Sequence, residues 1–219
     1  MVQIFNAERA VKLQHALARA ALSELEAAPL LNLSDVRYVA AFDSSYRGDM
    51  QYAAVVVYDL KNASVVEKVF SIVKASVPYI PGLLAFREVP GYVRAYSKLR
   101  VTPDVIMVDG HGLAHPRAFG IATHLGLALS KPSIGVAKNY LYGEIVEEGS
   151  RRLIKAHGRV VGEVIEHRKS KLYVSVGCKI RLESASELTR RTLAEGKRLP
   201  LPLSLADEYS KIIKSEHTR

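Results

Sequence analysis

The first segment of the chain carries apolar residues at helical spacing. Residues 7–27 place their apolar side chains on one face, which predicts an amphipathic helix that packs on the core. Asn6 is a suitable N-cap, and Pro29 cannot continue a helix, so we expect the helix to lie between these two residues.

Three segments with strand-like spacing follow. Residues 36–43 alternate between two faces, and residues 52–58 and 65–73 are rich in β-branched and aromatic side chains. Turn residues occur at Gly48-Asp49 and at 61–63. Because such short connections join antiparallel strands, we predict an antiparallel meander of three strands.

Helical and strand patterns then alternate. Residues 83–99 and 117–129 have helical spacing, whereas 104–109 and 132–137 are short apolar runs typical of strands buried on both faces. Pro90-Gly91 interrupts the first helical pattern and is expected to kink or split that helix. Helices that alternate with buried strands predict parallel strand pairing.

The last third of the chain predicts two or three more strands and two helices. Ser184 and Glu187 have the spacing of a capping box, which predicts a helix start. The predicted elements are strands around Leu153, at 160–165 and at 172–176, a helix from Ser184 to Gly196, and a short helix after residues 199–202.

Composition is that of an ordinary folded domain. With 219 residues, 48% hydrophobic and 24% charged, we expect one domain over residues 1–219. The single Cys178 fits a reducing compartment. The chain has no signal-like start and no apolar run near the roughly 20 residues of a membrane span. We therefore expect a cytoplasmic monomer without a membrane partner.

The charge balance is basic. Thirty-one Lys and Arg residues against 22 Asp and Glu give a formal net charge of +9. Such an excess favours a polyanionic partner and makes its binding sensitive to salt. Many basic proteins bind no nucleic acid, so the charge alone does not identify the partner.

Three acidic residues stand at the boundaries of predicted elements. Asp43 ends the first strand, Glu88 opens a helix and Asp109 ends the fourth strand. This order of elements is that of the ribonuclease H-like architecture, an α/β fold whose mixed sheet has three antiparallel strands and then parallel strands, flanked by helices. In that fold the first and fourth strands are neighbours, so Asp43 and Asp109 would lie side by side, with the helix of Glu88 over them.

Carboxylates held together at the edge of a rigid sheet can share a divalent cation. Oxygen ligands suit Mg²⁺, which can lower the pKa of an attacking water and stabilise charge on a leaving oxygen. Acids at strand ends are also common turn residues, but the joint order of these three favours a metal site.

Residues 109–117 combine glycines, histidines, a proline and an arginine. Pro116 predicts the first turn of the next helix, whose amides and Arg117 can face a phosphate. The glycines argue against a helical zinc pair of His111 and His115, and a His115 that contacts phosphate or handles a proton is the better interpretation. The alternative is a glycine-rich turn with incidental histidines.

Two more features can contact nucleic acid. Residues 78–82 hold Tyr79 between prolines, and a rigid exposed aromatic can wedge into stacked bases. Tyr79 can instead cap the core after the third strand. Lys138 follows a buried strand and emerges beside the acids, where it can neutralise a scissile phosphate. The basic groups Arg151-Arg152 and 167–171 are expected at hairpin tips.

These motifs resemble the endonuclease V family of deoxyinosine-directed repair nucleases, over roughly residues 7–210. The motifs that carry the resemblance are Phe42-Asp43-Ser44-Ser45-Tyr46, Val77-Pro78-Tyr79-Ile80-Pro81-Gly82-Leu83-Leu84-Ala85-Phe86-Arg87-Glu88, Val108-Asp109-Gly110-His111-Gly112, Ala114-His115-Pro116-Arg117, Gly120-Ile121-Ala122, Gly135-Val136-Ala137-Lys138 and Arg198-Leu199-Pro200-Leu201-Pro202.

The resemblance implies Mg²⁺- or Mn²⁺-dependent cleavage of the second phosphodiester bond 3′ to inosine, which leaves 3′-hydroxyl and 5′-phosphate ends. It assigns metal binding to Asp43 and Asp109, with Glu88 completing the acidic site. His115 and Lys138 match positions near the scissile phosphate. Asp207 matches a position near the C-terminus that is His in some family members and Asp in others.

The resemblance also assigns base recognition. Tyr79, with Pro78, Ile80, Pro81 and Gly82, belongs to a wedge that fills the space left by a flipped base. The hypoxanthine pocket of the family is formed largely by backbone and small or apolar residues. In this chain those residues are Gly82, Leu84, Gly110 and Gly120.

Two other functions remain open. One is a different ribonuclease H-like nuclease, such as a junction resolvase or an RNA-directed enzyme. The other is a basic nucleic-acid-binding module without chemistry, which the three acids disfavour because close carboxylates repel phosphate unless a cation bridges them. The sequence does not decide between inosine-containing DNA and inosine-containing RNA.

Overall fold

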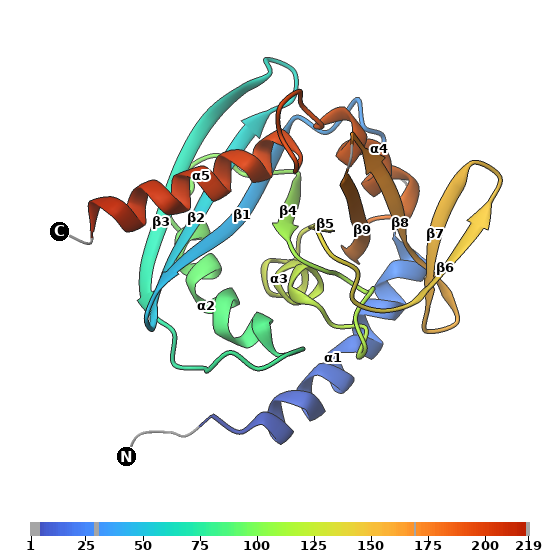
Figure 1. The fold of residues 1–219 in the computed structure, drawn as a ribbon, viewed down its shortest axis with the longest axis horizontal. Helices are drawn as coiled ribbons and strands as arrows, with labels where there is room; N and C mark the ends of the chain where they lie inside the picture. Colours follow the sequence, from blue (N-terminus) through green and yellow to red (C-terminus); the bar gives the residue numbers. More distant parts are fainter. Residues whose placement is uncertain (1–4, 29–30, 169, 218–219) are drawn as a thin grey trace.

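A mixed sheet of nine strands forms the frame of the described part of the chain (Figure 1). The computed structural model describes residues 5–28, 31–168 and 170–217. The strands lie in the order β3-β2-β1-β4-β5-β9-β8-β7-β6. Their bounds are β1 Tyr38–Arg47, β2 Met50–Asp59, β3 Ser64–Lys74, β4 Val105–Asp109, β5 Ser133–Ala137, β6 Glu144–Glu148, β7 Arg151–Ala156, β8 Arg159–His167 and β9 Ser170–Cys178.

The first five strands confirm the predicted topology. β1, β2 and β3 pair antiparallel, and β1, β4 and β5 pair parallel. The β1–β4 register places Phe42 opposite Val108, so the next residues, Asp43 and Asp109, lie side by side. The apolar residues of β4 and β5 are buried, as expected for parallel strands covered on both faces.

Four strands, rather than the two or three predicted, extend the sheet beyond β5. β9 pairs antiparallel with β5, and β8, β7 and β6 follow in antiparallel order. The sequence signal for β6 is weak because its residues Glu144–Glu148 are mostly exposed and acidic. The hairpin of β6 and β7 projects from the body of the molecule (Figure 1).

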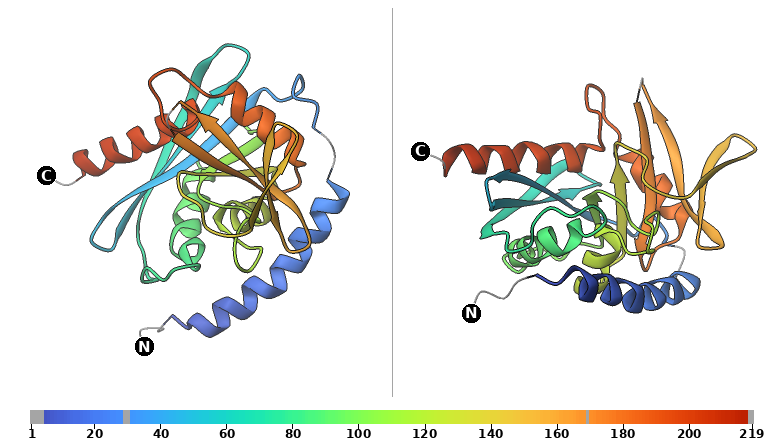
Figure 2. Two further views of the ribbon diagram at one scale, coloured as in Figure 1. Left: turned by 45° about the vertical axis from the view of Figure 1, so that its right-hand side comes forward. Right: turned by 60° about the horizontal axis from the view of Figure 1, so that its bottom comes forward.

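Five helices among the described residues cover the sheet. Figure 2 shows α5 across β1 and β2 on one face, and α2 and α3 on the opposite face. None of these helices is long and apolar enough to cross a membrane. Their bounds are α1 Ala7–Ala27, α2 Leu84–Tyr96, α3 Ile121–Leu129, α4 Leu182–Arg191 and α5 Leu201–Glu216.

The N-terminal helix confirms its prediction. The side chain of Asn6 accepts a hydrogen bond from the backbone N–H of Arg9 at 2.9 Å, which is an N-cap. The helix ends at Ala27, and Ala28 is its C-cap. The predicted stop at Pro29 lies outside the described residues.

Three predicted boundaries near the acids were wrong. β1 does not end at Asp43 but continues to Arg47, because its pairing with β2 extends to the Gly48-Asp49 turn. Glu88 does not open α2 but lies in its second turn. α3 begins at Ile121 instead of Arg117, because residues 113–118 form turns before the N-cap Gly120.

α2 is neither split nor ended by Pro90. Two side chains of the sheet bind backbone carbonyls beside this proline. Gln51 donates to the carbonyl of Glu88 at 3.0 Å, and Ser71 donates to that of Gly91 at 2.8 Å. These contacts fix the helix to β2 and β3 where the proline removes a backbone donor.

The C-terminal helices also differ from their prediction. α4 begins at Leu182, and Ser184 forms no capping box, because its hydroxyl donates to the carbonyl of Leu31 at 3.1 Å. The last helix, α5, has 16 residues and is not short. Its length lets it span the face of β1 and β2, so it carries Asp207 toward the carboxyl edge of the sheet.

A buried acid joins β7, β8 and α4. Glu163 on β8 is 1% exposed and receives hydrogen bonds from Arg151 at 3.2 and 2.9 Å and from Arg190 at 2.5 Å. Burial raises the pKa of Glu163, but the two guanidinium groups outweigh it and hold the pKa below its ordinary value of 4.5.

Glu163→Gln should destabilise the fold by about 2–3 kcal/mol at neutral pH, because an amide replaces a carboxylate bound by two guanidinium groups. Since the folded pKa is depressed, the contribution of Glu163 is present above about pH 4.5 and is lost as the pH falls through the folded pKa. Chemical denaturation between pH 3.5 and pH 7 measures this.

The variant should therefore lose less stability than the wild type on acidification. Glu187→Gln removes the acid of an exposed ion pair on α4 and is the matched control, with a change below about 1 kcal/mol. Parallel pH profiles for the wild type and Glu163→Gln would contradict the assignment.

Candidate active site

Four carboxylates from four elements face one region at the edge of the sheet. Asp43 comes from β1, Asp109 from the end of β4, Glu88 from α2 and Asp207 from α5. The charges of Asp109, Asp207 and Glu88 all raise the pKa of Asp43, which shows that the four groups interact. The three acids predicted at strand and helix boundaries are thus brought together.

Burial and mutual repulsion oppose ionisation of these acids. Burial first, and then the charge of Asp109, raise the pKa of Asp43 to about 8. Burial also raises the pKa of Asp109, although Lys138 lowers it by donating to the carboxylate at 2.6 Å. Lys138 follows β5 directly, so the parallel pairing of β4 and β5 sets this contact.

Glu88 is fixed by two tyrosines. Tyr92 donates to one carboxylate oxygen at 3.1 Å and Tyr46 to the other at 3.3 Å. Glu88 is 8% exposed, and burial raises its pKa to about 7 in spite of these hydrogen bonds. The positions of both tyrosines depend on the extension of β1 and on one turn of α2, so the sequence pattern did not single them out.

The donor set suits a hard divalent cation, yet it is not a preformed cage. No three His, Cys, Asp or Glu side chains among the described residues gather closely enough to hold a metal ion. Asp109 is bound by Lys138 and Asp207 by Lys211, both at 2.6 Å. A cation that needs only one or two carboxylates and keeps its waters, as Mg²⁺ does, fits this arrangement.

A cavity of about 160 Å³ opens beside the carboxylates. It brings together the predicted pocket and part of the predicted wedge, and four of its eleven lining residues are Gly or Ala. Its walls are formed by Tyr79, Gly82, Leu84, Ala85, Gly110, His111, His115, Phe119, Gly120, Ile121 and Leu141.

Glycines make the walls of this cavity possible. Gly110 directly follows Asp109 and has a φ of +153°, and a Cβ there would lie 2.6 Å from Ile121. A Cβ on Gly120 would lie 2.2 Å from the carbonyl oxygen of His111. Both positions therefore require close backbone approach, and any side chain would displace the wall.

The wedge segment stands at the mouth of this cavity. Tyr79 is 69% exposed, so it does not cap the core after β3, the alternative that the sequence left open. Pro78 and Pro81 are exposed, and Ile80 is half-buried. An exposed aromatic between two prolines loses little conformational freedom when it binds, which suits a stacking role.

A network of hydrogen bonds around Gln14 and Arg117, called the hub below, holds the backbone at Gly82, the last residue of the wedge segment. Gln14 of α1, fully buried, donates to the carbonyls of Gly82 at 2.9 Å and Phe119 at 3.2 Å. Arg117 donates to Gln14 at 2.5 Å and to the same Gly82 carbonyl at 2.8 Å. Helix α1 thereby fixes both sides of the cavity, a role that a polar residue within a helical pattern does not reveal.

Both histidines of the 109–117 segment lie at this cavity. Among the described residues, His115 contacts none of the carboxylates; its Nδ1 accepts a hydrogen bond from the backbone N–H of Arg117 at 3.2 Å. Burial, followed by the charge of Arg117, lowers the pKa of His115 to about 4, so its ring is neutral at pH 7. His111 binds the carbonyl of Asn139 at 3.0 Å, and no zinc site forms among the described residues.

Arg117 also differs from its expected position. It precedes α3 by four residues, and its guanidinium group binds Gln14 and Gly82 instead of facing solvent at a helix N-terminus. The basic residues Arg151 and Arg152 begin β7 and pair with Glu163 and Glu166. Part of the other predicted hairpin tip, Lys169, lies outside the described residues.

Known proteins are similar to this chain in fold and in sequence. The endonuclease V family model matches residues 20–208. An endonuclease V of Desulfurococcus amylolyticus is 51% identical over 208 residues, with 94% of this chain and 95% of the relative covered. The crystal structure of endonuclease V from Bacillus subtilis is 30% identical, with a TM-score of 0.88 and coverage of 99% of this chain and 95% of that chain.

A ligand-bound structure also matches. Endonuclease V of Ciona intestinalis, in complex with a 24mer DNA that contains an inosine followed by a ribo-adenosine, is 25% identical, with a TM-score of 0.79. The alignment covers 94% of this chain and 96% of that chain. Agreement of family model, close relatives and folds over nearly the whole chain shows that this chain belongs to the endonuclease V family.

Proposed function

We propose that this chain cuts inosine-containing DNA in a metal-dependent reaction, at the second phosphodiester bond 3′ to the lesion. The observation that carries the proposal is a cavity lined largely by glycine and apolar residues next to Asp109, one of four carboxylates whose charges act on one another. The cavity accepts a flipped base, and the carboxylates serve the cut. The relatives named endonuclease V support the same reaction.

Asp43 and Asp109 bind the cation in this proposal, with Glu88 and Asp207 around it. A bound Mg²⁺ or Mn²⁺ supplies a water of lowered pKa and stabilises charge on the leaving oxygen. Tyr46 and Tyr92 keep Glu88 oriented, and Lys138 exchanges its contact with Asp109 for the scissile phosphate. The products carry 3′-hydroxyl and 5′-phosphate ends.

The cavity reads the base by shape and backbone polarity. Gly110 and Gly120 leave room for a planar ring, and Leu84 and Ile121 supply apolar contact. Unpairing the lesion costs a few kcal/mol, which Tyr79 offsets by stacking in the vacated space. His115 is neutral and buried, so its proposed part is to hold the wall near Gly82 rather than to carry a charge at the phosphate.

The first test is strand cleavage of labelled duplexes with and without one deoxyinosine, in Mg²⁺ and in EDTA. An inosine-containing RNA runs in parallel, because the DNA of the Ciona complex contains a ribo-adenosine after the inosine. Cutting of both duplexes at equal rates would favour a different ribonuclease H-like nuclease.

Asp43→Asn and Asp109→Asn should each lower the rate of nicking by at least about a thousandfold, because each removes a proposed metal ligand. Mn²⁺ binding measured by calorimetry should weaken in both. The thermal unfolding midpoint in EDTA should not fall, since each change removes a carboxylate whose pKa burial raises. Near-normal turnover in either variant would contradict the assignment of that residue as a metal ligand.

Tyr79→Ala should weaken binding of inosine duplex about tenfold, because the exposed ring is lost from the wedge. Fluorescence anisotropy in Ca²⁺ measures binding, and Mn²⁺ affinity should stay unchanged. Tyr79→Phe keeps the ring and is the matched control, with affinity near the wild type. Equal affinity for all three proteins would refute the wedge.

Gln14→Leu should lower the preference for inosine over adenine and reduce stability by about 1–3 kcal/mol, because Phe119 loses a buried hydrogen-bond donor and Gly82 loses one of its donors. Cleavage of matched inosine and adenine duplexes gives the preference. His15→Ala changes an exposed neighbour on α1 and should leave both quantities as they are. A stable Gln14→Leu with full selectivity contradicts the role of the hub.

A further inference from the structure

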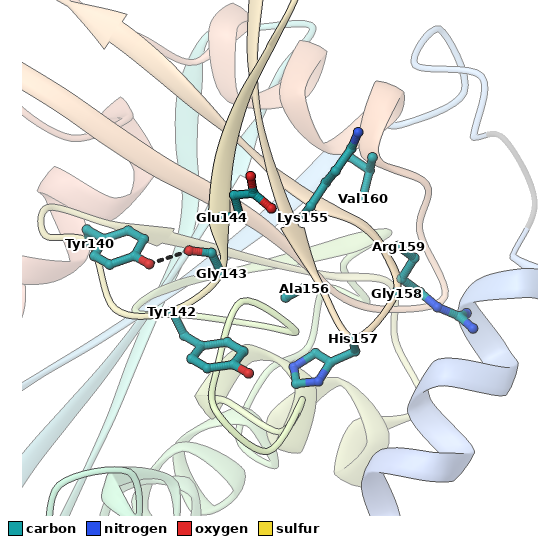
Figure 3. A pocket seen from close by; sticks show the side chains of 10 residues that line it. All are labelled: Tyr140, Tyr142, Gly143, Glu144, Lys155, Ala156, His157, Gly158, Arg159 and Val160. Atoms are coloured by element: carbon teal, nitrogen blue, oxygen red, sulfur yellow. Dashed lines mark hydrogen bonds between the residues drawn. The ribbon is translucent and has the colours of Figure 1, made fainter.

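A second, larger groove of about 800 Å³ lies between the loop after Lys138 and the hairpin of β7 and β8 (Figure 3). Tyr140 and Tyr142 come from the loop, and Lys155 and His157 come from the hairpin. The two tyrosines are 49% and 38% exposed. Large aromatic rings on an open surface suit contact with a partner.

The groove contains a preformed stack. The rings of Tyr142 and His157 lie 5.4 Å apart at an interplanar angle of 23°, and Figure 3 shows them facing each other at one end of the groove. Nε2 of His157 is 2.9 Å from the carbonyl oxygen of His115, which fixes its ring. A stacked pair with an accessible tyrosine offers a platform for a nucleobase.

Cationic side chains line the same groove. The ammonium group of Lys155 pairs with Glu148 at 2.9 Å, but both side chains are about half exposed. Such a pair contributes little, so Lys155 can exchange it for a phosphate. Arg159 lies in the same wall, and the one acid there, Glu144, lies opposite Lys155 in the strand register.

The groove lies next to the base cavity. Leu141 lines the cavity, whereas its neighbours Tyr140 and Tyr142 line the groove. The stacked end adjoins the His115 wall, because Nε2 of His157 lies 2.9 Å from the carbonyl oxygen of His115, and none of the four carboxylates of the site lines the groove. The groove therefore meets the cavity at the wall of Leu141 and His115 rather than at the carboxylates.

We propose that this groove binds unpaired nucleotides on the 5′ side of the inosine. The inference rests on the proposed function, because a cut 3′ to the lesion places the 3′ backbone at the carboxylates. The 5′ backbone then leaves the cavity past Leu141 and enters the groove. Tyr142 stacks on a base there, and Lys155 binds its phosphate.

The test compares single-stranded inosine DNA with a 5′ flank of about eight nucleotides or of one nucleotide, with the 3′ flank unchanged. For the wild type, KM should rise about tenfold when the 5′ flank is shortened, at constant kcat. On both substrates, Tyr142→Ala should have the KM that the wild type has on the short-flank substrate. Tyr142→Phe, which keeps the ring, should behave as the wild type.

Lys155→Gln should raise KM on the long substrate and flatten its dependence on salt, because one phosphate contact is lost. Arg191→Gln removes an equally exposed, ion-paired cation on α4 and should change neither quantity. If the wild type cuts at inosine with the same KM on both substrates, the proposal that the groove binds 5′ nucleotides is overturned, while the proposed function stands. If Tyr142→Ala raises KM over the wild type by the same factor on the long-flank and the short-flank substrate, the groove proposal is also overturned. Absence of any inosine-directed cutting by the wild type overturns the proposed function itself.

Discussion

The parallel pairing of β1 with β4 is the constraint on which the rest of the site depends. It places Asp43 beside Asp109 in a buried region, where their pKa values are raised by desolvation and, for Asp43, by the neighbouring charge. A fold does not gain stability from such a pair in the absence of a cation. In the proposed function this pair binds a divalent metal, and Lys138 holds one of the two carboxylates until the metal is bound.

The same edge of the sheet sets the distance between the carboxylates and the cavity. Gly110 follows Asp109 directly, so the wall of the cavity is covalently continuous with one of the carboxylates that we propose to bind metal. The opposite wall, at Gly82, is held by Gln14 and Arg117. Because α1, the wedge segment and the loop before α3 meet in this hub, we propose that a lesion in the cavity brings its backbone to the acids without movement of a separate domain.

Sequence patterns predicted the parts of the fold that are regular. The βββαβαβ order and the adjacency of Asp43 and Asp109 were confirmed because period-2 and period-3.6 patterns were strong there. The proline-flanked segment left the exposure of Tyr79 open, and it is the structure that shows the ring exposed. The start of α3 was mispredicted because residues after Pro116 look helical but form turns that carry the cavity wall. The roles of Gln14, Tyr46 and Tyr92 could not be predicted from sequence patterns, because they arise from contacts between elements far apart in sequence.

The distribution of polar groups explains how one site can favour hypoxanthine and reject other bases. An apolar wall alone discriminates weakly between planar rings of similar size. The backbone N–H groups of Gly110 and Gly120 are held by hydrogen bonds to the carbonyls of Val136 and Gly112, so this part of the wall is less free to rotate than a side chain. In the proposed function, rigidity of the wall supplies the selectivity and the buried hub around Gln14 supplies the rigidity, so a residue that touches neither metal nor base governs the choice of substrate.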